Sequence, residues 1–343
     1  MRVRRVVNVT SWPSEWVVRP ATIDDAERAV DMFNARSLAF YGENQSTVDE
    51  MRGWWTGPRF DLEKETQIVL DGNDRMIGWA HVGNQGEPYV SIGCGVIVHP
   101  DVEGEERLWD RLNGWAIDRA RTFVPLAPRE AQVVAVMSAL ERDEARRSAA
   151  KRAGFEIVRV ENKMRIDLES EPPEPTWPDG IAMRLADVER DLEAVARADM
   201  EAFRDHWGHV ERPFETELEG WQDYVRSKGD KLDPTLWFLA VDGEEIAGCS
   251  ICAPNIADDE TRGYVDGLCV RPAWRRRGIA LALLHQTFGE FYRRGYKAVE
   301  LDMDSENLTG ALGLYTKAGM HVTRQMMSYE KVLRGGVDLV KRE

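Results

Sequence analysis

Residues 264–320 hold most of the side chains whose types and spacing could do chemistry. An apolar, strand-like run at residues 265–270 leads into the basic turn Arg275-Arg276-Arg277-Gly278-Ile279-Ala280, and residues 281–293 then show helical periodicity. The N–H groups at a helix N-terminus are unpaired, and the helix dipole favours negative charge there. Small residues let a ligand approach the backbone closely, and arginines add charge-assisted hydrogen bonds. The turn is therefore expected to hold phosphate.

A second group of such residues follows another strand-like run at 298–303. It begins with Asn307 and continues as Ala311-Leu312-Gly313-Leu314-Tyr315-Thr316-Lys317-Ala318-Gly319-Met320. A phenol with a pKa of about 10 can donate a proton, so Tyr315 is a candidate general acid. The alternative is a core tyrosine whose hydroxyl finds a partner nearby.

Taken in order, the two groups resemble the GNAT family, the GCN5-related N-acetyltransferases. Members carry (Arg/Gln)-x-x-Gly-x-(Gly/Ala) after their fourth strand, then an Asn, then Ala-x-x-Leu-Tyr-x-x-x-Gly-Phe. The matching positions are Arg275, Gly278 and Ala280 in the first motif, then Asn307, then Ala311, Leu314, Tyr315 and Gly319 in the second, where Met320 replaces the Phe.

The resemblance implies that acetyl-CoA is the co-substrate and that no metal is needed. The turn from Arg275 to Ala280 would bind the pyrophosphate, and Asn307 would be a further cofactor contact. Backbone groups of the strand would pair with the pantetheine arm, as in β-augmentation, with one N–H polarising the thioester carbonyl. The strand residues concerned are Leu268, Cys269 and Val270.

Acetyl transfer to an amine also needs a base, because only about a thousandth of a lysine-like amine is uncharged near neutral pH. Strict strand alternation would put Tyr264, Asp266, Leu268 and Val270 on one face. Asp266 is the candidate base, since relatives often carry an acid on this strand. Tyr264 in that role, or Asp266 as an uninvolved edge carboxylate, are alternatives that the pattern leaves open.

A short polar segment, Asp205-His206-Trp207, lies between two predicted helices, where the GNAT fold usually lines the acceptor site. His209 follows closely, but no third ligand for a metal is evident. We therefore expect Asp205, His206 and Trp207 to recognise the acceptor.

Composition limits the class of protein. The chain has 343 residues, a net charge of −15 and 43% hydrophobic residues, which suits packed cores and disfavours nucleic acid as a partner. No signal peptide or membrane span is expected, so the predicted location is the cytoplasm. The four cysteines lie in apolar runs and are expected to be buried thiols, although Cys249 and Cys252 form a CxxC.

The chain repeats one pattern twice, at offsets of about 170 residues, which is the signature of a tandem fold. Asp71-Gly72 parallels Asp242-Gly243 at a predicted hairpin, and the run before Gly154 parallels the run before Gly319. The predicted organisation is an extension at 1–15, a first domain at 16–170, a Pro-rich linker at 171–176 and a second domain at 177–343. Each domain is expected to be α/β (α+β), with a mixed, mostly antiparallel sheet flanked by helices.

The first copy has lost the residues for chemistry. Its turn presents Glu103 where the second copy has Arg275 and Glu106 where it has Gly278, and Ala150 stands at the position of Tyr315. Carboxylates at the turn would repel a pyrophosphate. The first copy is thus expected to buttress the second or to shape its acceptor pocket.

Together these features predict a tandem GNAT acetyltransferase, monomeric or homodimeric, that acetylates a small amine by direct attack. The tandem layout with one degenerate copy is also similar to that of the mycothiol synthases, which acetylate an amino-sugar conjugate. A CoA-binding sensor or scaffold without activity is the alternative from another class.

Overall fold

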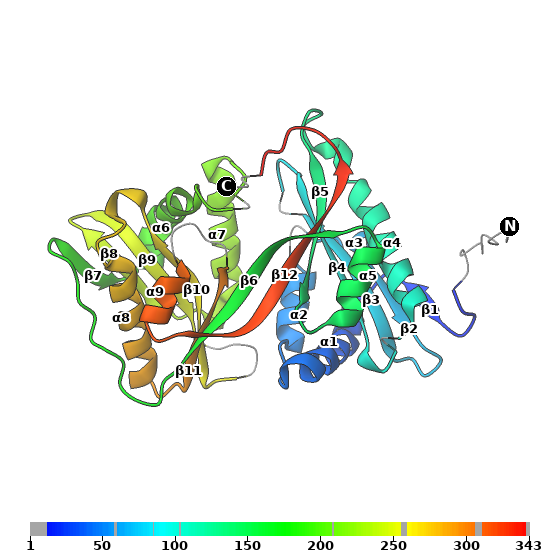
Figure 1. Cartoon of the computed structure of the whole chain (residues 1–343), viewed down its shortest axis with the longest axis horizontal. Coiled ribbons are helices and arrows are strands. Elements are labelled where there is room, and N and C mark those ends of the chain that lie inside the picture. Colours follow the sequence, from blue (N-terminus) through cyan, green and yellow to red (C-terminus); the bar gives the residue numbers. More distant parts are fainter. Residues whose placement is uncertain are drawn as a thin grey trace. The chain divides into compact units, whose positions relative to one another are not determined.

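The computed structural model describes residues 12–57, 60–84, 86–102, 104–207, 209–254, 259–305 and 311–340. The chain forms two compact units, and Figure 1 shows both of them. The first is Met1–Gly83 with Cys94–Ala120, and the second is Asn84–Gly93 with Arg121–Glu343. The domain boundaries that the sequence repeat indicates stay a prediction. The compact units of a folded chain need not coincide with the two copies of a repeated sequence.

In the first unit, strands follow one another in the order β1-β2-β3-β4, and β2 pairs antiparallel with β1 and β3. The predicted hairpin around Asp71-Gly72 is thus confirmed. The strands are β1 (Val17–Arg19), β2 (Thr66–Leu70), β3 (Met76–Asn84) and β4 (Ser91–Val98), and the helices are α1 (Ala26–Tyr41), α2 (Val48–Trp55), α3 (Leu62–Glu65) and α4 (Glu106–Arg121).

In the second unit, the strand order is β5-β12-β6-β11-β10-β9-β8-β7. Most pairs are antiparallel, and β10 with β11 is parallel. The strands are β5 (Val133–Leu140), β6 (Glu156–Asp167), β7 (Ile181–Leu185), β8 (Trp237–Asp242), β9 (Glu245–Ala253), β10 (Arg262–Val270), β11 (Ala298–Asp304) and β12 (His321–Arg334). The helices are α5 (Glu144–Arg152), α6 (Val188–Phe203), α7 (Phe214–Lys228), α8 (Ile279–Arg293) and α9 (Ala311–Lys317).

Strand β6 lies between β11 and β12 and pairs antiparallel with both, as the green ribbon in Figure 1 shows. By the sequence repeat, β6 is the last strand of the first copy, whereas its two neighbours end the second copy. The sheet that carries the second copy's motifs is therefore completed by a strand from the first.

Two apolar cores cover the two faces of this sheet. Helix α8 repeats Leu284, Phe288 and Phe291 at helical spacing, and these residues pack with α9 on one face. Helices α6 and α7 pack on the other face, around Trp237 of β8. Functional side chains on β10 and β11 can thus point either to the α8 side or to the α6 side.

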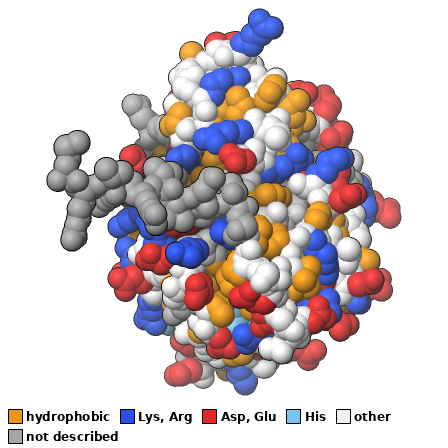
Figure 2. Space-filling view, turned by 90° about the vertical axis from the view of Figure 1, so that its right-hand side faces the viewer, with side chains coloured by type: hydrophobic (Ala, Val, Ile, Leu, Met, Phe, Trp, Pro, Cys, Tyr) orange, Lys and Arg blue, Asp and Glu red, His pale blue; other side chains and the backbone are white. Residues whose placement is uncertain are grey.

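Charged side chains of both signs are interspersed over the face drawn in Figure 2. On this face, lysines and arginines lie among the aspartates and glutamates that give the chain its net negative charge. Within the described residues, no helix is long and apolar enough to cross a membrane.

Candidate active site

Strands β10 and β11 pair only at their first residues. The parallel pairing joins Arg262–Tyr264 to Ala298–Glu300 and then stops, while β10 keeps its antiparallel partner β9. From residue 265 onward, one edge of β10 has no strand partner in the described part of the chain. Backbone N–H and C=O groups on that edge are available to a bound molecule.

A cavity of about 480 Å³ opens where the two strands separate. It lies within the second unit, and α6, β10, the turn before α8, α8, β11 and α9 all contribute to its walls. The predicted site residues that line it are His206, Asp266, Leu268, Cys269, Val270, Arg275, Arg276, Gly278, Ile279, Ala280 and Tyr315. Asn307 lies outside the described residues.

A β-bulge between Val265 and Gly267 corrects the predicted faces of β10. Leu268 and Val270 pack in the core on the α8 side. Asp266 points to the other side, where its Oδ2 accepts a 2.7 Å hydrogen bond from the hydroxyl of Tyr224 on α7. Placing Asp266 on the same face as Leu268 was wrong, because a bulge adds one residue and inverts the alternation beyond it.

The turn before α8 has the backbone of an anion site. Arg276 has φ 63° and Gly278 has φ 89°, both in the left-handed region, and Gly278 is the N-cap of α8. No side chain caps the helix, and its first turn holds no acid. The N–H groups there remain open to a phosphate.

The three arginines of the turn have different surroundings. Arg275 forms an ion pair with Asp205 and donates a 2.6 Å hydrogen bond to the carbonyl of Ala202, so it joins the turn to the end of α6. Arg277 donates to the carbonyl of Asp179 at 3.1 Å and does not line the cavity. Arg276 lines the cavity and has no ion-pair partner among the described residues, so it is the arginine best placed for a ligand.

Lys317 is a site residue that the sequence reasoning missed. It lines the cavity from α9 and, like Arg276, makes no ion pair in the described part of the chain. The signal was present, because Lys317 follows Tyr315 by two residues within the quoted motif.

Tyr315 is 9% exposed and lines the cavity from α9. Its hydroxyl has no hydrogen-bond partner among the residues that the structure describes. Burial raises the pKa of Tyr315 to about 12, so the phenol keeps its proton at neutral pH. It is thus a protonated, unengaged hydroxyl facing a cavity.

The segment Asp205-His206-Trp207 is divided between three environments. Asp205 is held by Arg275, whose guanidinium lowers the pKa of that carboxyl. Trp207 lies under the guanidinium of Arg159, at 5.1 Å from the ring centroid, and does not line the cavity. Only His206 faces the cavity, so the three residues do not form one recognition cluster.

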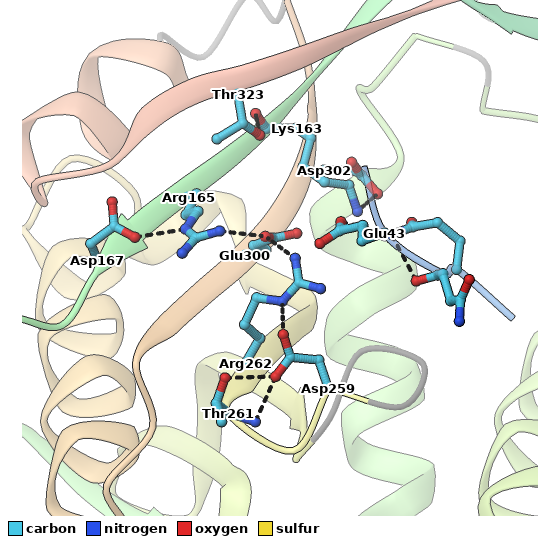
Figure 3. Close-up of polar contacts among 12 residues, drawn as sticks. Glu43, Lys163, Arg165, Asp167, Asp259, Thr261, Arg262, Glu300, Asp302 and Thr323 are labelled. Carbon is cyan, nitrogen blue, oxygen red and sulfur yellow. Dashed lines mark hydrogen bonds and ion pairs between the residues drawn. The ribbon is translucent and has the colours of Figure 1, made fainter. Parts of the chain in front are cut away.

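Strand β11 presents a row of acids, Glu300, Asp302 and Asp304, opposite β6. Their cross-strand partners are Arg165, Lys163 and Glu161. Figure 3 shows the first two pairs, with Glu300 also 3.2 Å from Arg262 and Asp302 3.1 Å from Lys163.

The third pair of this row sets two carboxylates opposite each other, which is unfavourable. Arg159 compensates Asp304 with two hydrogen bonds of 2.8 and 2.9 Å. Burial, together with the charges of Asp302 and Asp304, raises the pKa of Glu161. Asp302 and Asp304 line the cavity together with Asp266, so three carboxylates contribute to its walls.

No group of three or more potential metal ligands occurs within the described ranges. All four cysteines are buried and free, as expected, and Cys249 Sγ lies 3.4 Å from Cys269 Sγ on the neighbouring strand. The side chains at the cavity that could take part in proton transfer include Tyr315, His206 and Asp266.

Splayed strands, an open helix N-terminus with a left-handed glycine and a buried tyrosine at one cavity are the arrangement expected of an acyltransferase that uses acyl-CoA. The acetyltransferase (GNAT) family model matches residues 192–320. A GCN5-related N-acetyltransferase from Sphaerobacter thermophilus is similar with a TM-score of 0.79 and 32% identity, covering 96% of this chain and 99% of that one. This chain belongs to the GCN5-related N-acetyltransferase family, and it is an acetyltransferase of the tandem type.

Two further likenesses concern the tandem layout. A mycothiol acetyltransferase from Streptomyces scabiei is 26% identical over 272 residues, which are 79% of this chain and 79% of the relative. A tandem GNAT protein from the clavulanic acid biosynthesis pathway is similar with a TM-score of 0.72 and 12% identity, covering 94% of this chain and 100% of that one. The second likeness concerns the fold alone.

Proposed function

We propose that this protein transfers the acetyl group of acetyl-CoA directly to the amine of a small molecule, with Tyr315 as the general acid. The observation that carries the proposal is the hydroxyl of Tyr315, which is buried, protonated and without a partner in the described residues, in the cavity beside β10. A leaving thiolate needs such a proton donor.

The unpaired edge of β10 is proposed to hold the pantetheine arm through backbone hydrogen bonds. The N–H groups that follow Arg276 and Gly278 would take the pyrophosphate, and Lys317 would add a positive charge. A backbone N–H near Cys269 or Val270 would polarise the thioester carbonyl. Arg275 would hold the turn in place, because it donates a hydrogen bond to the carbonyl of Ala202 at the end of α6.

Asp266 is proposed to attract the ammonium form of the acceptor. Its carboxylate oxygen Oδ2 is already engaged by the Tyr224 hydroxyl and lies 3.8 Å from Lys228 Nζ. Those contacts stabilise a fixed negative charge in the cavity wall, and a fixed charge favours a cation. Lys163 pairs with Asp302 and Arg159 with Asp304, so the argument for a cationic acceptor rests on Asp266.

A second candidate acceptor follows from the relatives named mycothiol acetyltransferase, which match 79% of this chain in one case. It is an amino-sugar conjugate, and the cavity of about 480 Å³ would have to admit it beside the acyl group.

The test is release of CoA thiol from acetyl-CoA by the full-length protein with a panel of amines. The panel contains amino-sugar conjugates, a polyamine, free amino acids and a lysine peptide, and each acetylated product is identified by mass spectrometry. Transfer to small amines but not to the peptide supports the proposal. Binding of acetyl-CoA without turnover of any amine would favour a scaffold instead.

A further inference from the structure

His206 lines the cavity, but the proposed acetyl transfer assigns no role to its imidazole. It lies just beyond the last turn of α6 and contributes to the cavity wall. Its ring packs edge-on against Phe203, with 4.5 Å between the ring centroids, and this contact fixes its orientation. Neither ring nitrogen has a hydrogen-bond partner in the part of the chain that the structure describes.

The charged groups around His206 come from every element packed on it. Asp205 and His209 lie on its own segment, Arg275 on the turn before α8, and Asp304 on β11. The charge of Asp304 is compensated by Arg159. Burial outweighs the two carboxylates and lowers the pKa of His206, so the ring is neutral at neutral pH.

This environment differs from that of Asp266. The Asp266 carboxylate is engaged by a tyrosine hydroxyl and lies near a lysine, whereas the His206 ring has a free nitrogen lone pair beside the same cavity. A base must have its lone pair available to the proton that it takes. His206 meets this requirement without giving up a contact, whereas one of the two carboxylate oxygens of Asp266 is already held by Tyr224.

We propose that His206 is the general base that takes a proton from the acceptor's ammonium group, while Asp266 holds that group by charge. The inference rests on the proposed acetyl transfer and assigns its missing base. His206 accepts one proton, and the freed amine nitrogen forms a bond to the thioester carbon. The carbon–sulfur bond then breaks, and Tyr315 gives its proton to the thiolate. The second amine proton returns to Tyr315 directly or through water, and His206 releases its proton to solvent.

Two measurements on the full-length protein test this role. Proton–carbon NMR of the imidazole rings in the CoA complex, with the signal assigned by its loss in His206→Gln, gives the titration of His206 among the six histidines of the chain. It is expected below 6.5. Turnover of acetyl-CoA is followed by thiol release with the best amine of the panel, or with water as acceptor.

His206→Gln is expected to lower kcat by a factor of about 10² to 10⁴ with little change in the KM for acetyl-CoA. The acidic limb of the kcat–pH profile should vanish, and imidazole added to His206→Ala should restore part of the rate. His209→Gln is the matched control, because His209 contacts Glu211 and does not line the cavity.

Titration of His206 at 6.5 or above, or a His206→Gln enzyme that keeps the wild-type rate and acidic limb, would overturn the assignment. If the wild-type protein is active, either of these outcomes is still compatible with the proposed acetyl transfer. An inactive wild type contradicts the proposed function instead, and the NMR titration still decides whether His206 is neutral.

Discussion

Two residues at the cavity are proposed to have different roles, one through the shape of the backbone and one through proton transfer. Gly278 matters for its φ of 89°, which a residue with a side chain rarely adopts, and for the open N–H groups beside it. Tyr315 matters for one hydroxyl that the fold buries without engaging. These two roles predict different effects of substitution. A change at Gly278 should weaken cofactor binding, whereas a change at Tyr315 should lower kcat.

Gly278→Glu is expected to abolish CoA binding measured by calorimetry. The substitution puts a side chain and a negative charge where a pyrophosphate would lie, and it strains the left-handed backbone. Gly289→Glu makes the same change inside α8, where φ is not left-handed and no atom lies within 4 Å of the new Cβ. The control should bind normally, and equal affinity of both variants would refute the turn as the cofactor site.

Tyr315→Phe is expected to lower kcat by a factor of about 10² to 10⁴ and to leave the affinity for acetyl-CoA nearly unchanged. Because the pKa of Tyr315 is about 12, its acid form persists throughout pH 6 to 10, so Tyr315 should add no descending limb in that range. Steady-state kinetics and calorimetry separate the two parameters. A full-rate variant would mean that water protonates the thiolate.

At the scale of elements, the same strand–helix junction occurs in both copies. Arg19 at the end of β1 binds Asp25 through two hydrogen bonds of 2.7 Å, and Arg184 of β7 binds Asp191 at the start of α6. Asp191 also accepts from the backbone N–H of Asp187 at 2.9 Å. Each carboxylate thus joins a strand to the helix that follows it.

The Arg184 guanidinium is the largest cause that holds the pKa of Asp191 well below its usual range. The stabilisation is therefore complete above the unfolded pKa of about 3.9 and is lost as the pH falls through the folded value. Asp191→Asn should reduce the free energy of unfolding by about 1–3 kcal/mol near pH 7, and the difference should shrink as the pH falls below about 4.

Urea denaturation between pH 2 and 8 measures this difference. Glu189→Gln is the control, because Glu189 is an exposed acid in the first turn of the same helix. A deficit in Asp191→Asn that does not depend on pH would contradict the ionic explanation.

The elements were largely predictable, whereas some of their contacts were not. Local signals placed the Asp242-Gly243 hairpin, the turn before α8 and Tyr315, because periodicity and turn chemistry depend on neighbours in sequence. The bulge at Asp266 was missed although Gly267 beside it is a local signal, because a glycine inside a strand often marks a bulge. The engagement of Arg275 by Asp205 depends on packing across 70 residues, which no spacing rule conveys.

On the scale of the whole chain, the first copy keeps the architecture without the site. Glu105 and Glu106 remain at its turn, and Glu103 lies outside the described residues. Gly104 in this turn lacks the positive φ of Gly278. Ala150 is fully buried at the position that corresponds to Tyr315. In the part of the first copy that the structure describes, these positions therefore have neither the left-handed glycine of the second copy's turn nor a counterpart of Tyr315.

One acetyl-CoA per chain is the expected stoichiometry. Calorimetric titration of the full-length protein measures it directly, and Gly278→Glu should remove the whole signal. Two equivalent sites, or residual binding in that variant, would show that the first copy still holds the cofactor.

The second copy by itself is expected not to fold. A fragment of residues 177–343 lacks β6, so β11 and β12 lose the strand that pairs with both. A fragment of residues 121–343 keeps β5 and β6 and is the matched comparison. Circular dichroism and CoA binding should recover in the longer fragment, and a folded, binding-competent short fragment would contradict the role of β6.

The position of β6 has a consequence for evolution. Gene duplication usually leaves a spare copy that is free to change, and this one has Glu106 and Ala150 at the positions of Gly278 and Tyr315. Its last strand, however, pairs with both neighbours in the sheet of the second copy, so deleting the first copy would remove a central strand from that sheet. Selection should therefore conserve β6 more tightly across descendants than the residues at 100–106, although neither segment carries out any chemistry.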